Sequence, residues 1–314
     1  MAIFLMAPYT LERLNEYAKK ANIDIENKPL DVNSGEDEII EAIGKAPAVI
    51  AGSECYTRNV FEKLKGTLKT VIRFGAGYDS IDTKAARDNG IAIMIAGGGN
   101  SASVADQAVM LMASLCRQIC LFDREMRQGI WSQQRTSVQL TGKTVGLIGF
   151  GRIGKIVAQL LDGYRCKLLV HDDYVKDDIL RKYNISRKPV EEIAGESDIV
   201  SLHVPVTPET KGMINEKFFA LMKPTAYIVN TSRGQIVNEK DLIAALQNGQ
   251  IAGAGLDVFE NEPLGDSPLL KLQNVILSPH VSYNTVEANM LTAEITIKNL
   301  AEFRNMGTCL DVVN

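Results

Sequence analysis

The chain has 314 residues, 46% of them apolar and 23% charged, a composition typical of a globular protein long enough to form two domains. Its formal net charge of −4, with no cluster of Lys or Arg, gives no reason to expect a nucleic-acid partner. No apolar run approaches the roughly 20 residues that a membrane-spanning helix requires, and the first residues lack the basic start of a signal peptide.

The five cysteines are scattered, odd in number and without a C-x-x-C pair. This pattern is typical of reduced thiols in a cytoplasmic protein. Cys116 and Cys120 lie one helical turn apart, but no histidine stands near them in the sequence. We therefore expect no metal site.

Short apolar runs alternate with helical patterns in the first hundred residues, which is typical of a parallel sheet covered by helices. The predicted strands are 2–7, 48–51, 70–74 and 91–95, and the predicted helices are 11–21, 37–43, 59–64 and 83–88. The glycine-containing loop 75–79 directly follows a strand, where bare backbone N–H groups can meet an anion. The three consecutive glycines of 96–100 indicate a hinge or a domain boundary.

Residues 101–128 are rich in Ala, Val, Met and Leu and predict one long helix that ends at Gly129. The alternation then resumes and ends in a helix over 285–303, after predicted strands at 145–148, 167–172, 199–204, 226–230, 253–258 and 275–277. Two α/β lobes with a ligand-binding cleft between them are the simplest interpretation.

The stretch after the strand 145–148 has the order G-x-G-x-x-G and opens a helical pattern. Gly149 permits a tight strand-to-helix turn, Gly151 lets backbone N–H groups approach a pyrophosphate, and Gly154 lets helix and strand pack closely. The start of the helix then offers unpaired N–H groups to the phosphates. Taken alone, the pattern fits a plain glycine-rich turn equally well.

A second apolar run, 167–172, ends in the acidic residue Asp172, which lies 23 positions after the first glycine. A carboxylate at this place accepts hydrogen bonds from the adenosine ribose. It also repels a 2′-phosphate, so the sequence favours NAD over NADP. With strand, turn, helix, strand and acid in this order, we predict a dinucleotide-binding domain.

Each of the three histidines has a different sequence context. His171 stands at a strand end beside Asp172, in a structural role or near the adenosine. His203 lies within an apolar run, which favours a satisfied core histidine. His280 follows the predicted strand 275–277, and ligands of open α/β sheets bind outside the carboxyl ends of strands. A catalytic role and a structural one are equally open for it on position alone.

Charged residues also follow two of the neighbouring predicted strands. Arg233 follows the strand 226–230 beside a glycine, where it forms either a surface ion pair or a bidentate contact with a carboxylate. Asp257 and Glu262 follow the strand 253–258. They form either part of a site or an ordinary acidic turn before a proline.

The segments GLIGFGRIG, HDDY, SLHVPVTPET, NTSRG, LDVFENEP and SPH occur in this order. Together with RFGAGYDSID and NSASVADQAV, they resemble the D-isomer-specific 2-hydroxyacid dehydrogenase family over about residues 70–285. The resemblance implies an α/β protein with two doubly wound parallel-sheet domains and NAD as cofactor. Residues 101–284 would form the Rossmann NAD-binding domain, and residues 1–100 with 285–314 would form a flavodoxin-like substrate domain. The implied protein is a cytoplasmic homodimer built around 101–128.

The resemblance also assigns roles in hydride transfer between NADH and C2 of a small 2-keto acid. His280 would be the general acid or base, Glu262 would hydrogen-bond and orient it, and Arg233 would bind the substrate carboxylate. The backbone N–H groups of Ala76 and Gly77 would hold the same carboxylate. The implied cofactor contacts are Gly149, Gly151, Arg152, Ile153, Gly154, Asp172, Val204, Pro205, Thr210, Thr231, Ser232, Asp257 at the nicotinamide carboxamide, and His280.

Two departures from the family pattern bear on the substrate. Glu54 stands where phosphoglycerate dehydrogenases have an arginine for the phosphate, so we expect an unphosphorylated acid such as glyoxylate or hydroxypyruvate. Tyr283 adds bulk near the nicotinamide or the substrate. A phosphoglycerate dehydrogenase remains an alternative if another cation replaces the missing arginine. An NADH-sensing binding protein, like the corepressors of this family, is the alternative from a different functional class.

Overall fold

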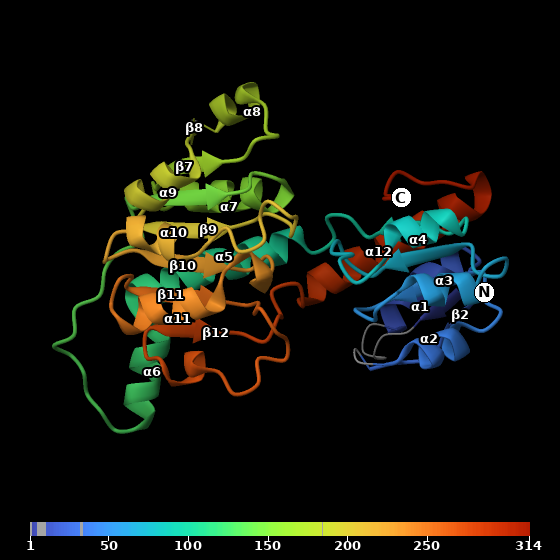
Figure 1. The fold of residues 1–314 in the computed structure, drawn as a ribbon, viewed down its shortest axis with the longest axis horizontal. Coiled ribbons are helices and arrows are strands. Elements are labelled where there is room, and N and C mark those ends of the chain that lie inside the picture. Colours follow the sequence, from blue (N-terminus) through green and yellow to red (C-terminus); the bar gives the residue numbers. More distant parts are fainter. Residues whose placement is uncertain (1, 5–10, 32–33, 184) are drawn as a thin grey trace. The chain divides into compact units, whose positions relative to one another are not determined.

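The structure is a computed structural model that describes residues 2–4, 11–31, 34–183 and 185–314. The chain divides into two compact units. One unit joins Met1–Asn100 to Asn284–Asn314, and the other is Ser101–Tyr283. Within the described residues, the first unit contains a five-stranded sheet and the second a seven-stranded sheet (Figure 1). Both sheets are parallel, as predicted.

The sheet of the first unit has the strand order β2-β1-β3-β4-β5. This is the flavodoxin-like order, so the predicted architecture is confirmed. Its elements are β1 (Ala2–Phe4), α1 (Leu11–Lys20), β2 (Ile25–Asn27), α2 (Glu36–Ile43), β3 (Ala48–Ala51), α3 (Arg58–Lys63), β4 (Thr70–Arg73), α4 (Thr83–Asp88), β5 (Ala92–Ile95) and α12 (Val286–Met306).

The start of the chain differs in part from the sequence prediction. The expected strand 2–7 is described only as β1, because residues 5–7 lie outside the described residues. Strand β2 was not predicted. It is three residues long, contains a glutamate and an asparagine, and pairs with β1 at the edge of the sheet. Such a short polar edge strand carries no alternating apolar pattern that a sequence reading could detect.

The sheet of the second unit has the order β12-β11-β10-β9-β6-β7-β8. Read from β8, this is the Rossmann order with one added strand, which confirms the second predicted architecture. The elements are α5 (Ser101–Arg117), α6 (Ile119–Arg127), β6 (Thr144–Ile148), α7 (Arg152–Asp162), β7 (Lys167–His171), α8 (Asp177–Lys182), β8 (Ser186–Arg187), α9 (Val190–Glu196), β9 (Ile199–Leu202), α10 (Glu216–Leu221), β10 (Tyr227–Asn230), η2 (Gly234–Ile236), α11 (Glu239–Gln247), β11 (Gly253–Leu256), η3 (Pro268–Lys271) and β12 (Val275–Leu277).

The prediction of one helix over 101–128 is wrong. The chain breaks at Gln118, which has a φ of +53°, and α5 and α6 meet at an angle of 62°. Residues 136–138, in the segment that returns toward the sheet, form hydrogen bonds with residues at the break. The amide of Val138 donates to the carbonyl of Cys116 at 3.0 Å, and the Gln118 side chain donates to the carbonyl of Thr136 at 3.3 Å. These partners are distant in sequence, and no glycine or proline marks the break.

Helix α5 packs against the sheet of its own unit. Its buried face includes Ala105, Ala108 and Met112. Leu111 lies close to β11: a Cβ added at Gly255 would be 3.1 Å from the Cβ of Leu111. In the described part of the chain, no single helix is long and apolar enough to cross a membrane. The bent pair α5 and α6 reaches that length and composition jointly, but α5 is a core helix of this unit.

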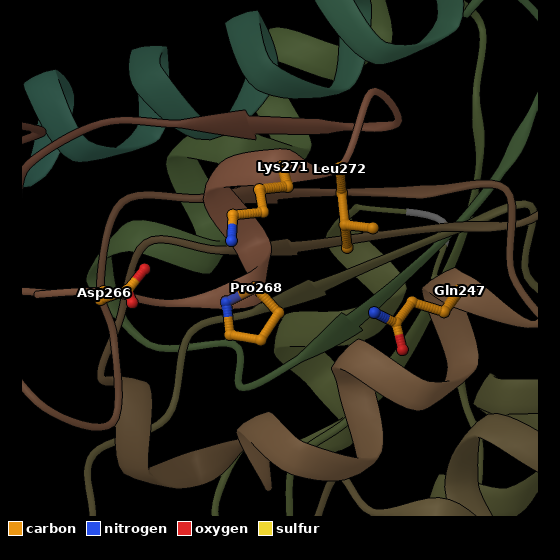
Figure 2. Close-up of a pocket in the computed structure, with 5 residues that line it drawn as sticks. All are labelled: Gln247, Asp266, Pro268, Lys271 and Leu272. Carbon is orange, nitrogen blue, oxygen red and sulfur yellow. The ribbon is translucent and has the colours of Figure 1, made fainter.

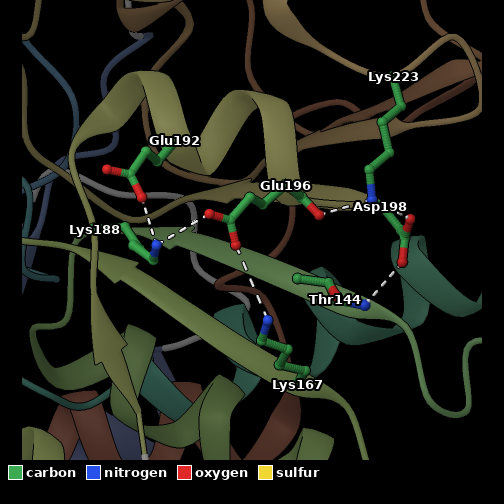
Figure 3. A network of polar contacts seen from close by, with 7 residues as sticks. All are labelled: Thr144, Lys167, Lys188, Glu192, Glu196, Asp198 and Lys223. Atoms are coloured by element: carbon green, nitrogen blue, oxygen red, sulfur yellow. Dashed lines mark hydrogen bonds and ion pairs between the residues drawn. The ribbon is translucent and has the colours of Figure 1, made fainter.

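A polar network joins elements at the amino ends of the central strands (Figure 3). Lys223 donates to Asp198 at 2.8 Å and to the carbonyl of Glu196 at 2.7 Å. The other oxygen of Asp198 accepts from the amide of Thr144, the first residue of β6, at 2.9 Å. Lys188 contacts Glu196 at 3.0 Å. The contacts of Asp198 fix the amino edge of the sheet, where β6 and β9 begin. The motif residues lie at the opposite, carboxyl edge.

Candidate active site

Three neighbouring strands end beside the charged residues that the motifs single out. In the order β12-β11-β10, Arg233 follows β10 and His280 follows β12. Asp257 and Glu262 follow β11, the strand between them. The strands are parallel and pair through their carboxyl-terminal residues. The side chains that follow these strands therefore gather at one edge of the sheet, where open α/β proteins bind ligands.

His280 and Glu262 form a hydrogen-bonded pair. The distance from His280 Nδ1 to Glu262 Oε2 is 2.7 Å, and Glu262 Oε1 accepts from the amide of Phe259 at 2.9 Å. Burial raises the pKa of Glu262, but the hydrogen bonds from His280 and Phe259 and the charges of His280 and Arg233 outweigh it, so this pKa lies below its usual value. Glu262 is therefore a carboxylate near neutral pH and fixes the orientation of the imidazole.

The turn that carries Arg233 is held by the buried side chain of Asn230. Its Oδ1 accepts from the amide and the hydroxyl of Ser232 at 3.0 and 2.8 Å, and its Nδ2 donates to the carbonyl of Arg233 at 2.9 Å. The guanidinium of Arg233 donates to the carbonyl of Ser232 at 2.7 Å. These bonds fix the backbone from which the arginine side chain extends.

Gly234 brings this turn against the segment that carries Glu262. A Cβ at Gly234 would lie 1.9 Å from the carbonyl carbon of Phe259, so only glycine fits. Gln235 adds a hydrogen bond to the carbonyl of Glu260 at 3.3 Å. The structure thus packs the arginine turn directly against the loop between β11 and Glu262.

Tyr283 lies against the imidazole of His280. The ring centroids are 6.1 Å apart and the rings are nearly perpendicular, at 80°, which is an edge-to-face contact. The large side chain of Tyr283, which follows the SPH motif in the sequence, therefore lies beside the ring of His280.

The three motif glycines have different surroundings. A Cβ at Gly149 would lie 2.5 Å from the carbonyl oxygen of His203, and one at Gly154 would lie 2.4 Å from that of Gly149. A Cβ at Gly151 would meet nothing within 4 Å. Packing within the protein therefore requires two of the glycines, whereas at Gly151 a side chain would occupy open space beside the start of α7.

The glycine-rich loop and the start of α7 together form a cradle that fits the pyrophosphate of a dinucleotide. Arg152 and Ile153 are the first residues of α7, an 11-residue helix whose first-turn amides have no acceptor within the helix. Such a helix start binds phosphate through its N–H groups and its partial positive charge.

Asp172 lies next to the glycine-rich loop. Its Oδ2 accepts from the amide of Phe150 at 2.7 Å, and its Oδ1 accepts from the amides of Tyr174 and Val175 at 2.8 and 2.9 Å. Burial raises the pKa of Asp172, but these N–H groups and the charge of Arg187 outweigh it, so the pKa is lowered. The structure thus keeps a carboxylate at the end of β7, and that carboxylate also ties the glycine-rich loop to this strand.

The remaining cofactor residues of the sequence analysis lie in loops that follow β9 and β10. Val204 and Pro205 follow β9, and Thr210 closes their loop by donating to the carbonyl of Pro205 at 2.7 Å. Thr231 follows β10 and is buried, and its hydroxyl has no hydrogen-bond partner among the described residues. A buried hydroxyl without a partner at this edge is consistent with a ligand that supplies one.

The other two histidines have local partners. His171 Nδ1 lies 3.2 Å from the carbonyl oxygen of Lys188. His203 Nε2 lies 3.0 Å from Ser201 Oγ, and burial lowers the pKa of His203 to about 4. The side chain of His203 is thus neutral at physiological pH. Its Nδ1, however, has no partner among the described residues, so the expected core histidine is only half satisfied.

The candidate substrate residues of the first unit lie after β3 and β4. Ala76 and Gly77 follow β4, and among the described residues neither of their amides donates a hydrogen bond to the backbone. Glu54 follows β3 and is only 3% exposed, and its Oε2 has no partner among the described residues. Burial raises the pKa of Glu54, since it outweighs the nearby backbone amides and the charge of Arg73.

Sequence reasoning missed several residues that build this site. Asn230 and Gly234 flank Arg233 in the NTSRG motif, and Ser278 begins the SPH motif, yet none was assigned a role. Their motifs carried a signal, but their functions depend on partners in other loops. A single sequence does not show which loops meet.

Comparison with known proteins agrees with this geometry. The sequence model described as D-isomer specific 2-hydroxyacid dehydrogenase, NAD binding domain, matches residues 109–282. The glyoxylate reductase of Korarchaeum cryptofilum is 40% identical over 253 residues, 79% of this chain and 76% of that protein. The chain belongs to the D-isomer-specific 2-hydroxyacid dehydrogenase family. It is an NAD(P)-dependent oxidoreductase.

Two further similar proteins show the range of similarity to this dehydrogenase. A D-3-phosphoglycerate dehydrogenase of Archaeoglobus fulgidus is 33% identical over 316 residues, all of this chain but 59% of that protein. The crystal structure of a glyoxylate reductase from Paecilomyes thermophila has a TM-score of 0.88 and 27% identity, covering 99% of this chain and 97% of that one. The family resemblance therefore extends beyond the NAD-binding unit.

A hollow of this dehydrogenase is lined by residues outside the motifs. It has a volume of about 250 Å³ and is lined by residues near the ends of α11 and η3 (Figure 2): Gln247, Asp266, Pro268, Lys271 and Leu272. None of these five residues belongs to the candidate site that the motifs single out. Within the described residues, no group of three His, Cys, Asp or Glu side chains is placed to hold a metal ion.

The glycine surroundings lead to a test of the cofactor cradle. In Gly151→Ala, we expect the Kd for NADH to rise about tenfold, equivalent to about 1.4 kcal/mol. The free energy of unfolding should change by less than about 0.5 kcal/mol. Gly154→Ala is the matched control, and its overpacking should instead lower the free energy of unfolding by about 1–3 kcal/mol. Fluorescence titration with NADH and urea unfolding measure both quantities. Unchanged NADH affinity in Gly151→Ala would contradict the assignment.

Proposed function

We propose that this dehydrogenase interconverts a small, unphosphorylated 2-keto acid of the glyoxylate or hydroxypyruvate class and its D-2-hydroxy acid, with NAD as cofactor. The observation that carries the proposal is the 2.7 Å pair of His280 and Glu262 on the sheet edge that also carries Arg233. An acid/base group, its orienting carboxylate and a carboxylate-binding cation are the components that this reaction needs.

In the proposed mechanism, Arg233 binds the substrate carboxylate, with the amides of Ala76 and Gly77 as further donors. Glu262 accepts the hydrogen bond from Nδ1 of His280, so Nε2 is the nitrogen that gives a proton to the ketone oxygen during reduction and takes it back during oxidation. When bound beside these residues, a nicotinamide would supply the hydride to C2 during reduction and accept it during oxidation. Arg233 and protonated His280 stabilise the negative charge that develops on the ketone oxygen.

The preference for NAD is proposed from the carboxylate of Asp172. It stays ionised beside the glycine-rich loop, where the adenosine ribose would accompany a pyrophosphate bound at Gly151. The neighbouring guanidinium of Arg187 is engaged by the carbonyls of Asp172 and Val175 and by Asp177. A 2′-phosphate would therefore meet a fixed negative charge beside a cation that already has partners. Val204, Pro205, Thr210, Thr231 and Ser232 are proposed to line the rest of the cofactor site.

The class of substrate is proposed from Glu54. This side chain offers a buried acid where a phosphate would need a cation. Arg73 favours the second candidate, a phosphoglycerate dehydrogenase, because its charge acts on Glu54 from the end of the neighbouring strand. Its guanidinium, however, donates to the carbonyl of Phe74 at 2.9 Å and to Ser53 Oγ at 3.3 Å. These bonds commit Arg73 to the loops themselves, so the unphosphorylated acid remains the preferred assignment.

A homodimer is proposed from the surface of α6 and the segment after it, which project from the sheet of their own unit (Figure 1). Ile119, Met126, Ile130 and Trp131 are 53%, 52%, 48% and 74% exposed there. Exposed large apolar side chains gathered on one projecting element are typical of a protein–protein interface.

The five cysteines form no disulfide, which is consistent with the reducing conditions of a cytoplasm.

Replacement of the proposed acid tests the mechanism. His280→Ala should lower kcat by about 10²–10⁴-fold, the usual contribution of general acid–base catalysis. The Kd for NADH should stay within about twofold of the wild-type value, because the phosphates and the ribose supply most of that affinity. Steady-state turnover of glyoxylate and hydroxypyruvate measures kcat, and fluorescence titration measures the Kd for NADH. Undiminished turnover would refute the role of His280, and a wild-type protein that binds NADH without turning over would favour the NADH-sensing binding protein.

Cofactor preference is tested at Asp172. Asp172→Asn removes the charge but keeps an acceptor for the loop amides. The ratio of kcat/KM with NADPH to that with NADH should rise about tenfold, since repulsion worth about 1.4 kcal/mol is lost. Asp173→Asn is the matched control on the exposed neighbour and should leave the ratio unchanged. A wild-type enzyme that uses NADPH as well as NADH would show that Asp172 does not discriminate.

Substrate class is tested with Glu54→Gln, which removes a carboxylate at nearly constant volume. The kcat/KM for phosphohydroxypyruvate relative to hydroxypyruvate should rise several-fold, about 1 kcal/mol of lost repulsion. Circular dichroism of both proteins controls for folding, because Glu54 is buried. A wild-type preference for the phosphorylated substrate would instead support the phosphoglycerate dehydrogenase.

A further inference from the structure

Two polar side-chain atoms of the first unit are buried without a hydrogen-bond partner in the short segment that follows β3. Glu54 is 3% exposed and Tyr56 is 0% exposed. Among the described residues, neither Oε2 of Glu54 nor the hydroxyl oxygen of Tyr56 has a partner. Burying a polar group without a hydrogen bond costs free energy. Two such atoms so close in sequence indicate a place where a ligand or a water molecule completes the bonding.

The side chains of this segment alternate in exposure, as they do in an extended strand. Ser53 and Cys55 are exposed, whereas Gly52, Glu54 and Tyr56 are buried. Every second side chain of an extended chain points to the same side. Glu54 and Tyr56 therefore point to one common side, where Gly52 contributes no side chain.

The same sheet edge carries the loop that is proposed to hold the substrate carboxylate. Strands β3 and β4 pair in parallel, with Ala51 opposite Arg73 at their ends, so the segment after β3 lies beside residues 76–77. Nη2 of Arg73 donates to Ser53 Oγ at 3.3 Å and ties the two loops together. The carboxylate and the carbonyl of a 2-keto acid are engaged in the proposed mechanism, so its C3 substituent is the part that remains to meet Glu54.

Tyr56 is held firmly by its backbone and by its ring. Its amide donates to the carbonyl of Ser80 at 2.8 Å, and its carbonyl accepts from the amide of Asp82 at 2.9 Å. Its ring stacks on Phe61, with centroids 6.1 Å apart and planes at 24°. Burial and the charge of Glu54 raise the pKa of Tyr56, so its phenol is protonated near neutral pH. The hydroxyl thus keeps one position and has a proton to donate.

The two unpartnered atoms suit a group that donates one hydrogen bond and accepts another. The carboxylate of Glu54 is an acceptor, and the hydroxyl of Tyr56 is a donor. A hydroxyl group satisfies both, whereas a methyl group satisfies neither and an ammonium group cannot accept. The positive charge of Arg73 already acts on Glu54, so this carboxylate does not depend on a cationic ligand.

We propose that Glu54 and Tyr56 form a subsite that selects a hydroxyl group on C3 of the substrate, so that the preferred substrate is a 3-hydroxy-2-keto acid such as hydroxypyruvate. The hydroxyl group donates to Oε2 of Glu54 and accepts from the phenol of Tyr56. The inference rests on the proposed function and narrows it. Glyoxylate has no C3, and the methyl group of pyruvate leaves both buried atoms unpaired.

The first test compares two substrates that differ in this hydroxyl group alone. With NADH, the kcat/KM of the wild-type protein should be at least about 100-fold higher for hydroxypyruvate than for pyruvate, because a site built to bind a hydroxyl group rejects the analogue that lacks it. A ratio below threefold would overturn the proposal. Faster turnover of 2-oxo-5-guanidinopentanoate than of hydroxypyruvate would overturn it in favour of a cationic substrate. Failure to reduce any 2-keto acid would instead refute the proposed function.

Variants of the two residues test whether the selection comes from this subsite. Tyr56→Phe should lower kcat/KM for hydroxypyruvate about 3- to 10-fold, because one hydrogen bond is lost. Glu54→Gln should lower it about tenfold, because a neutral acceptor replaces a carboxylate. The kcat/KM for pyruvate should stay within about threefold of wild type in both variants. Cys55→Ser is the matched control on the exposed side of the same segment and should change neither value.

Equal losses with both substrates would overturn the proposal, because a structural role, or a bound water molecule between the two residues, does not depend on the hydroxyl group of the substrate. Unfolding in urea gives an independent readout. The hydroxyl of Tyr56 has no partner among the described residues, so Tyr56→Phe should leave the midpoint unchanged or raise it. A lower midpoint would show that the hydroxyl bonds within the protein and would also overturn the proposal. If Glu54→Gln does not fold, the substrate ratio and the midpoint of Tyr56→Phe decide.

Discussion

The site depends on the parallel pairing of β10, β11 and β12. Because neighbouring parallel strands end at the same edge, the turns after them are adjacent although Arg233 and His280 are far apart in sequence. Two close contacts then fix how these turns meet. Gly234 lets the arginine turn pack against the backbone of Phe259, and Glu262 reaches from that loop to His280. A side chain at Gly234 would separate the two halves of the site.

The same principle of close approach organises the nucleotide-binding edge. Gly149 and Gly154 are required by contacts within the protein, so they shape the turn between β6 and α7. Gly151 is free of such contacts, and the missing side chain there leaves the amides at the start of α7 accessible. Asp172 then links β7 to this loop through the amide of Phe150. One carboxylate therefore both supports the loop and stands where a ribose would be recognised.

Asp257 and Glu262, the two acids that follow β11, differ in their surroundings. Asp257 is buried and hydrogen-bonded to neutral donors, whereas the side chain of Glu262 is 35% exposed and hydrogen-bonded to the imidazole of His280. A buried acid of the first kind stabilises one loop conformation, because another conformation would separate the buried oxygens from their hydrogen-bond donors. An acid of the second kind orients a group that must change its protonation state. The two carboxylates follow the same strand, yet their surroundings suit them to different tasks.

The alternation of apolar runs and the spacing of the glycines were enough to predict parallel sheets in two α/β lobes with a dinucleotide-binding site. The order of the motifs carried the family resemblance, and that resemblance implied the two sheet architectures. These signals are local, because strand periodicity and turn chemistry depend on neighbouring residues. The break at Gln118, the edge strand β2 and the bonds of Asp257 and Asn230 were not visible in the sequence. Each of them is decided by partners distant along the chain: the segment 136–138, strand β1, and the turns after β12 and β10. The sequence by itself determined which chemical groups are available and which strands precede them, whereas only the tertiary structure decided which of those groups touch.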